Sequence, residues 1–470
     1  MAFGRAGIYT RIFRNEESVG RAIESILGQN YKNLRYYIMV NDATRPIVEK
    51  YAQADERVKI LYWHPGDKMG FCFYAPIMVE EGNEYVASLD ADDWYERNWL
   101  ESMIYFMEKN TLDVAACGSR FVDEAGKLRG YRGTGEDLCM DREQFPDYFP
   151  EMYQFCRTIW GKLYSAKSIR AFDPGEHPDS EEYGDYGGDT VYVLEILRGV
   201  KRFGISKRIL HNYQVSFQSS SYTNFARGRL GADEFLFRFA KDFLRHLGGV
   251  SERNEIFLYA VYSFAVRDTV RMVHKNMEAR EQAEAYGDIF KHELTQKAVL
   301  LSRKGKLTGE KKGNFARYIT QLFLDSVCRM EKKQAECCVA SWRQMLPPQE
   351  MLLKYLLQDT TFVKEYPRLI FELADGEWDE AMKLCDKLLD TTENGDYQGC
   401  LAEVLLDLAA LSGNIEYFVR GKYAKLVYMI KKRNTRQAVR EYQDLLEMGV
   451  SEDDLNERLS ESDKDIIGLH

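Results

Sequence analysis

The first part of the chain alternates short apolar runs with stretches that have one apolar face. Four runs have the length and the β-branched or aromatic content of buried strands: residues 7–10, 35–40, 58–62 and 84–89. Two stretches between them repeat apolar residues at helical spacing: residues 18–29 and 46–54. Strands that alternate with helices are typical of βαβ units, so this pattern predicts an α/β fold with a mostly parallel sheet.

The pattern changes twice further along the chain. Residues 134–190 are irregular and rich in Gly, Pro, Asp and aromatic residues, which is typical of loops that build a pocket. Beyond residue 231 long helical patterns dominate, interrupted by a basic, polar stretch at 302–313. We therefore predict an α/β domain over residues 1–230 and an all-α domain over residues 231–470, with two sub-bundles divided near 302–313.

Two features of the helical half leave alternatives open. Residues 376–381 and 433–438 each begin a helix in a manner similar to tetratricopeptide units, so 368–450 is either a short repeat scaffold of that kind or an irregular bundle. Residues 422–436 combine basic and apolar side chains at helical spacing. This pattern fits either a packed helix with a solvated rim or a helix that docks peripherally on anionic lipid.

Composition narrows the functional classes. The chain has 470 residues, 45% of them hydrophobic and 29% charged, as expected for a folded protein of two or three domains. Its formal net charge of −10 disfavours a nucleic-acid binder, which needs a positive field. Nine cysteines without a CxxC pair indicate neither a disulfide framework nor a zinc site. The N-terminus lacks a signal-peptide core and no apolar run reaches the roughly 20 residues that span a bilayer, so we expect a cytoplasmic protein.

Acidic residues follow two of the predicted strands. Asp42 comes after residues 35–40, and the cluster Asp90-Ala91-Asp92-Asp93 comes after residues 84–89. Ligands of open α/β sheets bind at this carboxyl edge. Aspartates also favour turns and helix N-caps, so the cluster by itself does not identify a site.

Three segments resemble, in chain order, the motifs of the family 2 glycosyltransferases with the GT-A fold. Residues 14–17 with 22–27 resemble the family's opening strand-helix signature, residues 40–44 (VNDAT) resemble its Val-Asp-Asp-Gly-Ser turn, and residues 89–94 (LDADDW) match its DxD motif. The resemblance covers roughly the first half of the chain. It implies a GT-A, Rossmann-like sheet flanked by helices, a nucleotide sugar donor and a divalent cation, Mn²⁺ or Mg²⁺.

The matched positions imply a donor and metal site. A divalent cation stabilises the negative charge of the departing diphosphate, and carboxylates hold such an ion. Asp92 matches the metal ligand, and Asp90 either shares the ion or contacts the ribose. Asp42 matches the contact to uracil or ribose, and Thr10 lies on the donor side at the end of the first strand. His211, which follows a strand-like run, either completes the metal site or is an ordinary structural residue.

An inverting transfer also needs a base for the acceptor hydroxyl. Residues 183–190, followed by an apolar helix, resemble the family's Glu-Asp motif, in which Asp189 takes the position of the base. Asp185 is the alternative base, and capping of the following helix is the alternative role of Asp189. Gly188 stands where the family more often has glutamate.

Two further segments bear on the acceptor and the donor phosphates. Residues 160–164 (WGKLY) resemble a family segment on the acceptor side, which assigns Trp160, Lys162 and Tyr164 to that side. The alternative for Trp160 and Tyr164 is packing in the core, and Lys162 either contacts phosphate or is simply solvated. The family's Ala-Arg-Asn element is absent, and residues 73–76 (FYAP) occupy the comparable region. This departure removes one of the family's contacts to the donor.

The resemblance implies a metal-dependent, inverting glycosyltransferase. Its donor would be a nucleotide diphosphate sugar, with a UDP-sugar favoured, and its acceptor a hydroxyl of a glycan or a lipid-linked glycan in cell-surface polysaccharide synthesis. Such a role is compatible with peripheral contact at the inner face of the membrane and with a homo-oligomer. The alternatives are a non-catalytic nucleotide-sugar binder or scaffold of a glycan assembly complex, and a nucleotidyl transferase that releases pyrophosphate.

Overall fold

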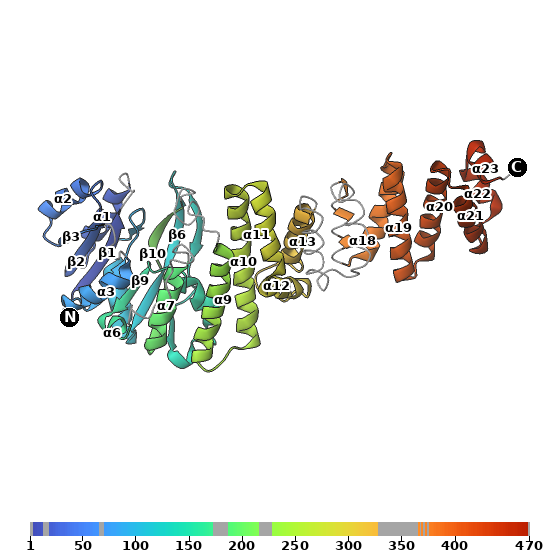
Figure 1. Ribbon diagram of the computed structural model, residues 1–470. Helices are drawn as coiled ribbons and strands as arrows, with labels where there is room; N and C mark the ends of the chain where they lie inside the picture. Colours follow the sequence, from blue (N-terminus) through green and yellow to red (C-terminus); the bar gives the residue numbers. More distant parts are fainter. Residues whose placement is uncertain are drawn as a thin grey trace. The chain divides into compact units, whose positions relative to one another are not determined.

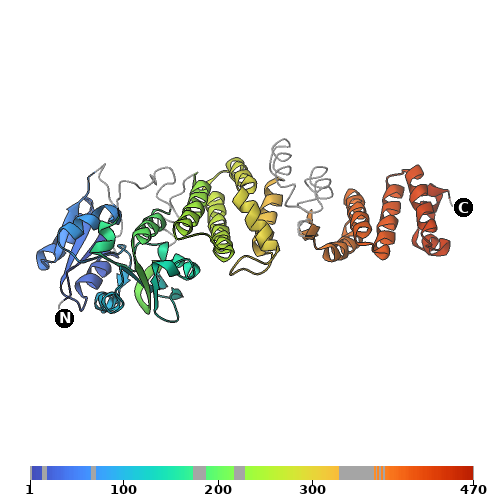
Figure 2. The same ribbon diagram turned by 90° about the horizontal axis from the view of Figure 1, so that it is seen from below.

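The computed structural model describes residues 3–12, 18–64, 70–172, 187–215, 228–327 and 365–468, except 367, 370–371 and 374–375. The chain divides into two compact units, Met1–Met272 and Val273–His470. The first unit contains a β-sheet with helices packed against it (Figure 1; Figure 2). Helices are the only regular elements among the described residues of the second unit.

The first unit contains a ten-stranded sheet in the order β3-β2-β1-β4-β9-β6-β10-β5, with β7 beside β6 and β8 beside β10. The strands are β1 (Ala6–Ile12), β2 (Leu34–Val40), β3 (Val58–Tyr62), β4 (Tyr85–Ser88), β5 (Trp94–Tyr95), β6 (Val114–Asp123), β7 (Leu128–Arg132), β8 (Leu138–Asp141), β9 (Lys162–Ser165) and β10 (Arg202–Val215). β1 is parallel to β2 and β4, β2 to β3, and β6 to β10. β9 is antiparallel to β4 and β6. The predicted α/β fold is confirmed, but the sheet is mixed, because the short strands β5, β7 and β8 also run against their neighbours.

Helices cover both faces of this sheet, as the alternation of side chains along the strands requires. The helices of the first unit are α1 (Val19–Leu27), α2 (Arg45–Ala54), α3 (Phe71–Glu80), α4 (Trp99–Asn110), α5 (Phe149–Cys156), α6 (Ala166–Arg170), α7 (Gly188–Gly199), α9 (Arg229–His246) and α10 (Glu252–Asn276), with a 3₁₀ turn at Arg142–Gln144. Ile8 of β1 faces the core that α1 and α4 share with the sheet. Its neighbour Tyr9 faces α3, where its ring contacts Phe71. The predicted apolar face of α1 is buried in that first core.

The first unit extends past the predicted domain boundary near residue 230. All described strands end by Val215, but α9 packs against α7, and the start of α10 is bonded to the loop before α5. Arg253 donates to the carbonyl of Asp147 at 2.8 Å, and Asn254 donates to that of Pro146 at 2.7 Å. These contacts join the start of α10 to the first unit, which ends at Met272, within α10.

The described part of the second unit is helical. Its helices are α11 (Ala279–Lys291), α12 (Glu293–Arg303), α13 (Asn314–Val327), α18 (Trp378–Thr391), α19 (Gly395–Ser412), α20 (Ile415–Lys431), α21 (Thr435–Glu447), α22 (Glu452–Arg458) and α23 (Glu461–Ile467). The basic stretch at 302–313 contains the end of α12 and its connection to α13, and these two helices contact each other. The two segments with tetratricopeptide-like character begin α18 and α21. Among the residues that the structure describes, no helix has the length and apolar character to cross a membrane.

The basic stretch at 422–436 covers the second half of α20 and the turn into α21. Lys422 of α20 is bonded to Glu441 at 2.8 Å and to Asp444 at 2.6 Å, both on α21. Lys425 lies 3.0 Å from Glu403 of α19. The apolar side chains of the same helix lie in a core shared with α21 to α23. Lys422 and Lys425 are therefore partnered within the unit, which favours the interpretation as a packed helix.

Candidate functional site

An acidic turn follows β4 at the carboxyl edge of the sheet. The N–H of Asp93 donates to the carbonyl of Asp90 at 3.2 Å, which closes the turn. Carboxylate oxygens of Asp90, Asp92 and Asp93 all lie within 4.8 Å of one another, so this group has the composition and spacing to hold a metal ion. Surrounding protein, and then the charges of Asp92 and Asp189, raise the pKa of Asp90 to about 7, although its side chain keeps an exposed surface. Burial also raises the pKa of Asp92. Negative charge that is buried in this way, and that Arg11 and Arg21 offset only in part, favours a bound cation.

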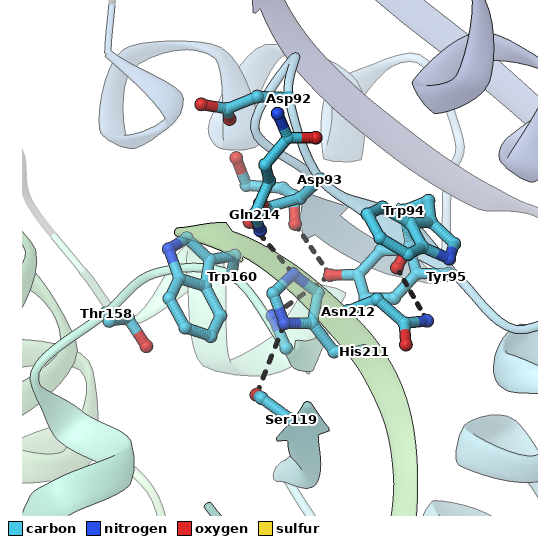
Figure 3. Close-up of polar contacts among 12 residues, drawn as sticks. Asp92, Asp93, Trp94, Tyr95, Ser119, Thr158, Trp160, His211, Asn212 and Gln214 are labelled. Carbon is cyan, nitrogen blue, oxygen red and sulfur yellow. Dashed lines mark hydrogen bonds and ion pairs between the residues drawn. The ribbon is translucent and has the colours of Figure 1, made fainter. Parts of the chain in front are cut away.

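Asp93 has a different environment from the other two aspartates. Its side chain is 0% exposed, and its Oδ1 accepts from the backbone N–H of Gln214 on β10 at 2.8 Å. Its Oδ2 lies 3.1 Å from Nε2 of His211, whose Nδ1 lies 3.2 Å from Oγ of Ser119 (Figure 3). Burial raises the pKa of Asp93 and lowers that of His211, because neither charged form is hydrated there. Asp93 thus ties the turn to β10, and Asp90 and Asp92 offer the carboxylates for an ion.

His211 lies beneath the acidic turn. It is fully buried and stacks on Trp160, with 4.3 Å between the ring centroids (Figure 3). Both ring nitrogens contact protein atoms, and the candidate metal group among the described residues does not include His211. Metal ligation by His211 would require its contact with Asp93 to break. Its burial and these contacts favour the alternative in which His211 is an ordinary structural residue.

Asp189 lies in the first turn of α7. Its Oδ2 accepts a hydrogen bond from the backbone N–H of Ile159 at 3.0 Å. Burial raises the pKa of Asp189, and the bond from Ile159 with the charges of Lys162 and Arg11 opposes part of that shift. The N-cap of α7 is Gly187, so the carboxylate of Asp189 does not serve as the helix cap. A carboxylate with a raised pKa, partly exposed, suits a general base.

The sheet topology brings the three acidic segments to one edge. β1, β2 and β4 are parallel, so Asp42 and Asp90, which follow β2 and β4, lie beyond the same ends of the strands. β9 is antiparallel to β4 and therefore begins at that edge, just after Ile159. Asp42 is exposed, and Asn41 beside it accepts from the N–H of Thr44 at 3.1 Å, which orders the turn. Asp189 is close enough to Asp90 for its charge to raise the pKa of Asp90.

The remaining predicted site residues point into the protein. Thr10 is buried, and its hydroxyl accepts from that of Tyr36 at 3.0 Å. Trp160, Lys162 and Tyr164 are buried as well, with 6%, 1% and 0% exposure. The ammonium of Lys162 donates hydrogen bonds to the main-chain carbonyls of Thr158 and Trp160. This burial favours the core alternative for Trp160 and Tyr164. Lys162 is not the solvated side chain that the sequence left open, and Thr10 has no exposed surface toward a donor.

Several predicted features lie outside the described residues. These are the residues of the opening signature at 14–17 and the alternative base Asp185. The part of the Glu-Asp segment that the structure describes begins at Gly187.

Two arginines of the site were not identified from the sequence. Arg21 of α1 donates to the carbonyl of Asp92 at 2.9 Å and lies over the ring of Trp94 at 3.9 Å. Arg11 follows Tyr9 by two residues on β1, and Tyr9 pairs with Ser88 of β4. The charge of Arg11 lowers the pKa of Asp90. The resemblance assigns no role to either position, and their proximity to the acidic turn depends on sheet register that single-sequence patterns do not reveal.

The first part of the chain is similar in sequence to known proteins. Residues 8–169 match the family described as Glycosyl transferase family 2. An uncharacterized glycosyltransferase of Haemophilus influenzae is 29% identical over 114 residues, which are 23% of this chain and 33% of that protein. The putative glycosyltransferase EpsH of Bacillus subtilis is 30% identical over 169 residues, 34% of this chain and 46% of EpsH. The putative teichuronic acid biosynthesis glycosyltransferase TuaG of the same organism is 23% identical over 122 residues, 25% of this chain and 48% of TuaG.

Each of these matches spans less than half of the relative's length. Among solved structures, the crystal structure of S. aureus TarS 1-349 in complex with UDP-GlcNAc has a TM-score of 0.44 and 12% sequence identity. That match covers 64% of this chain and 85% of the TarS chain.

Proposed function

Because residues 8–169 belong to the glycosyl transferase family 2, we propose that the protein is a metal-dependent, inverting glycosyltransferase that uses a nucleotide diphosphate sugar. The observation that carries the proposal is the juxtaposition of Asp90 and Asp92 with Asp189 at one edge of the sheet. Asp90 and Asp92 offer neighbouring carboxylates whose negative charge is disfavoured by burial and is offset only in part by Arg11 and Arg21. Asp189 offers a partly exposed carboxylate held by a main-chain hydrogen bond.

A divalent metal ion fits the carboxylate ligands that this site offers. Asp90 and Asp92 supply oxygen ligands, and Mg²⁺ or Mn²⁺ keeps coordination positions for phosphate oxygens when only one or two carboxylates bind it. A bound cation would stabilise the charge that develops on the diphosphate. Asp93 orients the turn from below through its contacts with β10.

In the reaction, Asp189 takes the proton of the acceptor hydroxyl. The hydroxyl oxygen forms a bond to the anomeric carbon as the bond from that carbon to the diphosphate breaks on the opposite face, which inverts the configuration. The raised pKa of Asp189 makes it a better proton acceptor than an ordinary aspartate. Asp42, exposed beyond β2, is assigned to the nucleobase or ribose of the donor.

Similarity supports a proposal for the donor and acceptor classes. The turn containing Asp42 favours a UDP-sugar through its resemblance to the family's nucleobase contact. The similarity to TuaG, whose name refers to teichuronic acid biosynthesis, favours an acceptor hydroxyl on a surface polysaccharide or its lipid-linked precursor. The helical second unit would then serve acceptor selection or assembly.

A donor screen tests this proposal. Purified protein is incubated with a panel of UDP- and GDP-sugars and Mn²⁺ or Mg²⁺, and release of the nucleoside diphosphate is measured with and without EDTA. We expect release with at least one donor, abolished by EDTA and restored by the metal. Folded protein that releases no diphosphate from any donor, yet binds one, would favour a non-catalytic binder, and pyrophosphate release from a nucleoside triphosphate would indicate nucleotidyl transfer.

A further inference from the structure

The loop Thr158-Ile159-Trp160 is fixed from the interior by two side chains of β9. The ammonium of Lys162 donates to the carbonyl of Thr158 and, at 3.3 Å, to that of Trp160. The hydroxyl of Tyr164 donates to the carbonyl of Ile159 at 3.1 Å. All three carbonyls of the loop are therefore bonded to buried side chains.

The N–H of Ile159 in this loop donates to Asp189 at 3.0 Å. β9 itself is anchored in the sheet, since Lys162 pairs with Ala116 of β6 and Tyr164 pairs with Val86 of β4. The chain of contacts thus runs from the sheet through Lys162 and Tyr164 to the loop, and from the Ile159 amide to the carboxylate of Asp189.

We propose that Lys162 and Tyr164 are positioning residues, which fix the loop at 158–160 so that the Ile159 amide orients the carboxylate of Asp189 for proton transfer. The inference rests on the proposed role of Asp189 as the base. It gives the WGKLY segment a function different from acceptor binding, because neither side chain reaches the surface.

Packing alone does not account for a lysine at this position. Lys162 is 1% exposed, and an ammonium without hydration is destabilising compared with an apolar side chain of the same length. Burial, and then the charge of Arg132, lower the pKa of Lys162 to about 7. The lysine does, however, donate hydrogen bonds to the carbonyls of Thr158 and Trp160, on either side of Ile159.

The charged groups around Asp189 determine in which direction its pKa should move in the test variants. Lys162 of β9, Arg11 of β1 and the Ile159 amide lower the pKa of Asp189, and Asp90 after β4 lies near it with like charge. If the loop loses these supports, the hydrogen bond from the Ile159 N–H to Asp189 weakens, and the pKa of Asp189 rises. A base must be deprotonated to act, so the acidic limb of the pH–rate profile then moves to higher pH.

The variants are Tyr164→Phe, which removes one hydroxyl, and Lys162→Met, which keeps the length of the side chain. Tyr85→Phe is the matched control. It removes a hydroxyl that donates to Glu108, and Tyr85 lies at the start of β4, the end away from the acidic turn. We expect both test variants to lower kcat about 10- to 100-fold, as misplacement of a catalytic group by roughly an ångström does, with little change in donor KM. The control should keep the wild-type kcat and pH profile.

A second readout does not need turnover. In protein labelled with ¹⁵N-isoleucine, the Ile159 amide signal, assigned through Ile159→Val, should titrate with Asp189, and its midpoint should move to higher pH in both variants. Variants with wild-type kcat and an unchanged Ile159 midpoint would overturn the inference. Wild-type protein that transfers no sugar, but whose Ile159 signal responds as expected, would refute the proposed function alone.

Discussion

Nε2 of His211 lies 3.1 Å from Oδ2 of Asp93, and both side chains are 0% exposed. This contact joins β10 to the turn that carries Asp90 and Asp92. Asp93 belongs by spacing to the group that has the geometry for a metal ion, yet its two oxygens already face His211 and the N–H of Gln214. We therefore propose that Asp93 supports the acidic turn and that Asp90 and Asp92 would hold the ion.

The two neighbouring aspartates should respond differently to the same substitution. Asp93→Asn keeps an acceptor for Gln214 and offers an amide donor to Nε2 of His211, so Mn²⁺ affinity should change by less than about threefold. Asp92→Asn removes a charged ligand and should lower that affinity more than about tenfold. Isothermal titration with Mn²⁺ and UDP measures both. Equal losses in the two variants would mean that Asp93 is itself a ligand.

Metal affinity should depend on pH through Asp90. Its carboxyl has a pKa of about 7, so it holds a proton below that pH, and the cation must displace this proton to bind. Affinity should therefore rise about tenfold between pH 6 and pH 8 and change little above that. Asp90→Asn should bind Mn²⁺ more weakly and without this dependence. A flat pH profile for the wild type would contradict the assignment of Asp90 as a ligand.

Gly188 and Gly187 form a matched pair at the start of α7. A Cβ on Gly188 would meet no atom within 4 Å, so Gly188→Glu should fold, and the favourable charge at a helix N-terminus should raise stability by about 0.5–1 kcal/mol. Gly187 has φ 86°, and a Cβ there would lie 2.6 Å from Leu236, so Gly187→Glu should be clearly destabilising. Urea denaturation compares the two. A destabilised Gly188→Glu protein would show that the glycine is structurally required.

Glu441 should be important for the stability of the second unit. It is 2% exposed and lies 2.8 Å from Lys422 and 3.3 Å from Lys425. Glu441→Gln leaves these ammonium groups less compensated and should lower the free energy of unfolding by about 2–3 kcal/mol. Glu461→Gln removes an exposed i,i+3 partner of Lys464 and should change it by less than about 0.5 kcal/mol. Similar small effects in both variants would show that the Glu441 network does not stabilise this unit.

Local patterns predicted the elements that place the acidic groups. The strand predicted at 58–62 is Val58–Tyr62 in the structure, and the one predicted at 84–89 is Tyr85–Ser88. Both succeed because apolar runs between turn residues carry their own signal. The DxD cluster follows directly from the end of β4, so its position at the sheet edge needed no long-range information.

The supports of the site were not predictable in the same way. The bond from Ile159 to Asp189 spans 30 residues and uses a backbone N–H, which no residue type encodes. The environment of His211 depends on Ser119, 92 residues earlier, and on the ring of Trp160. A sequence shows that such residues are polar or aromatic, but only the packed sheet shows which of them face one another.

Asp189→Asn tests the central claim most directly. Donor affinity by calorimetry and sugar transfer to an acceptor extract are measured in parallel on the wild type and this variant, with the metal present. We predict donor binding within about threefold of the wild type and transfer lowered by at least about 10²-fold, the typical loss of a general base. Transfer by Asp189→Asn at the wild-type rate would contradict the account.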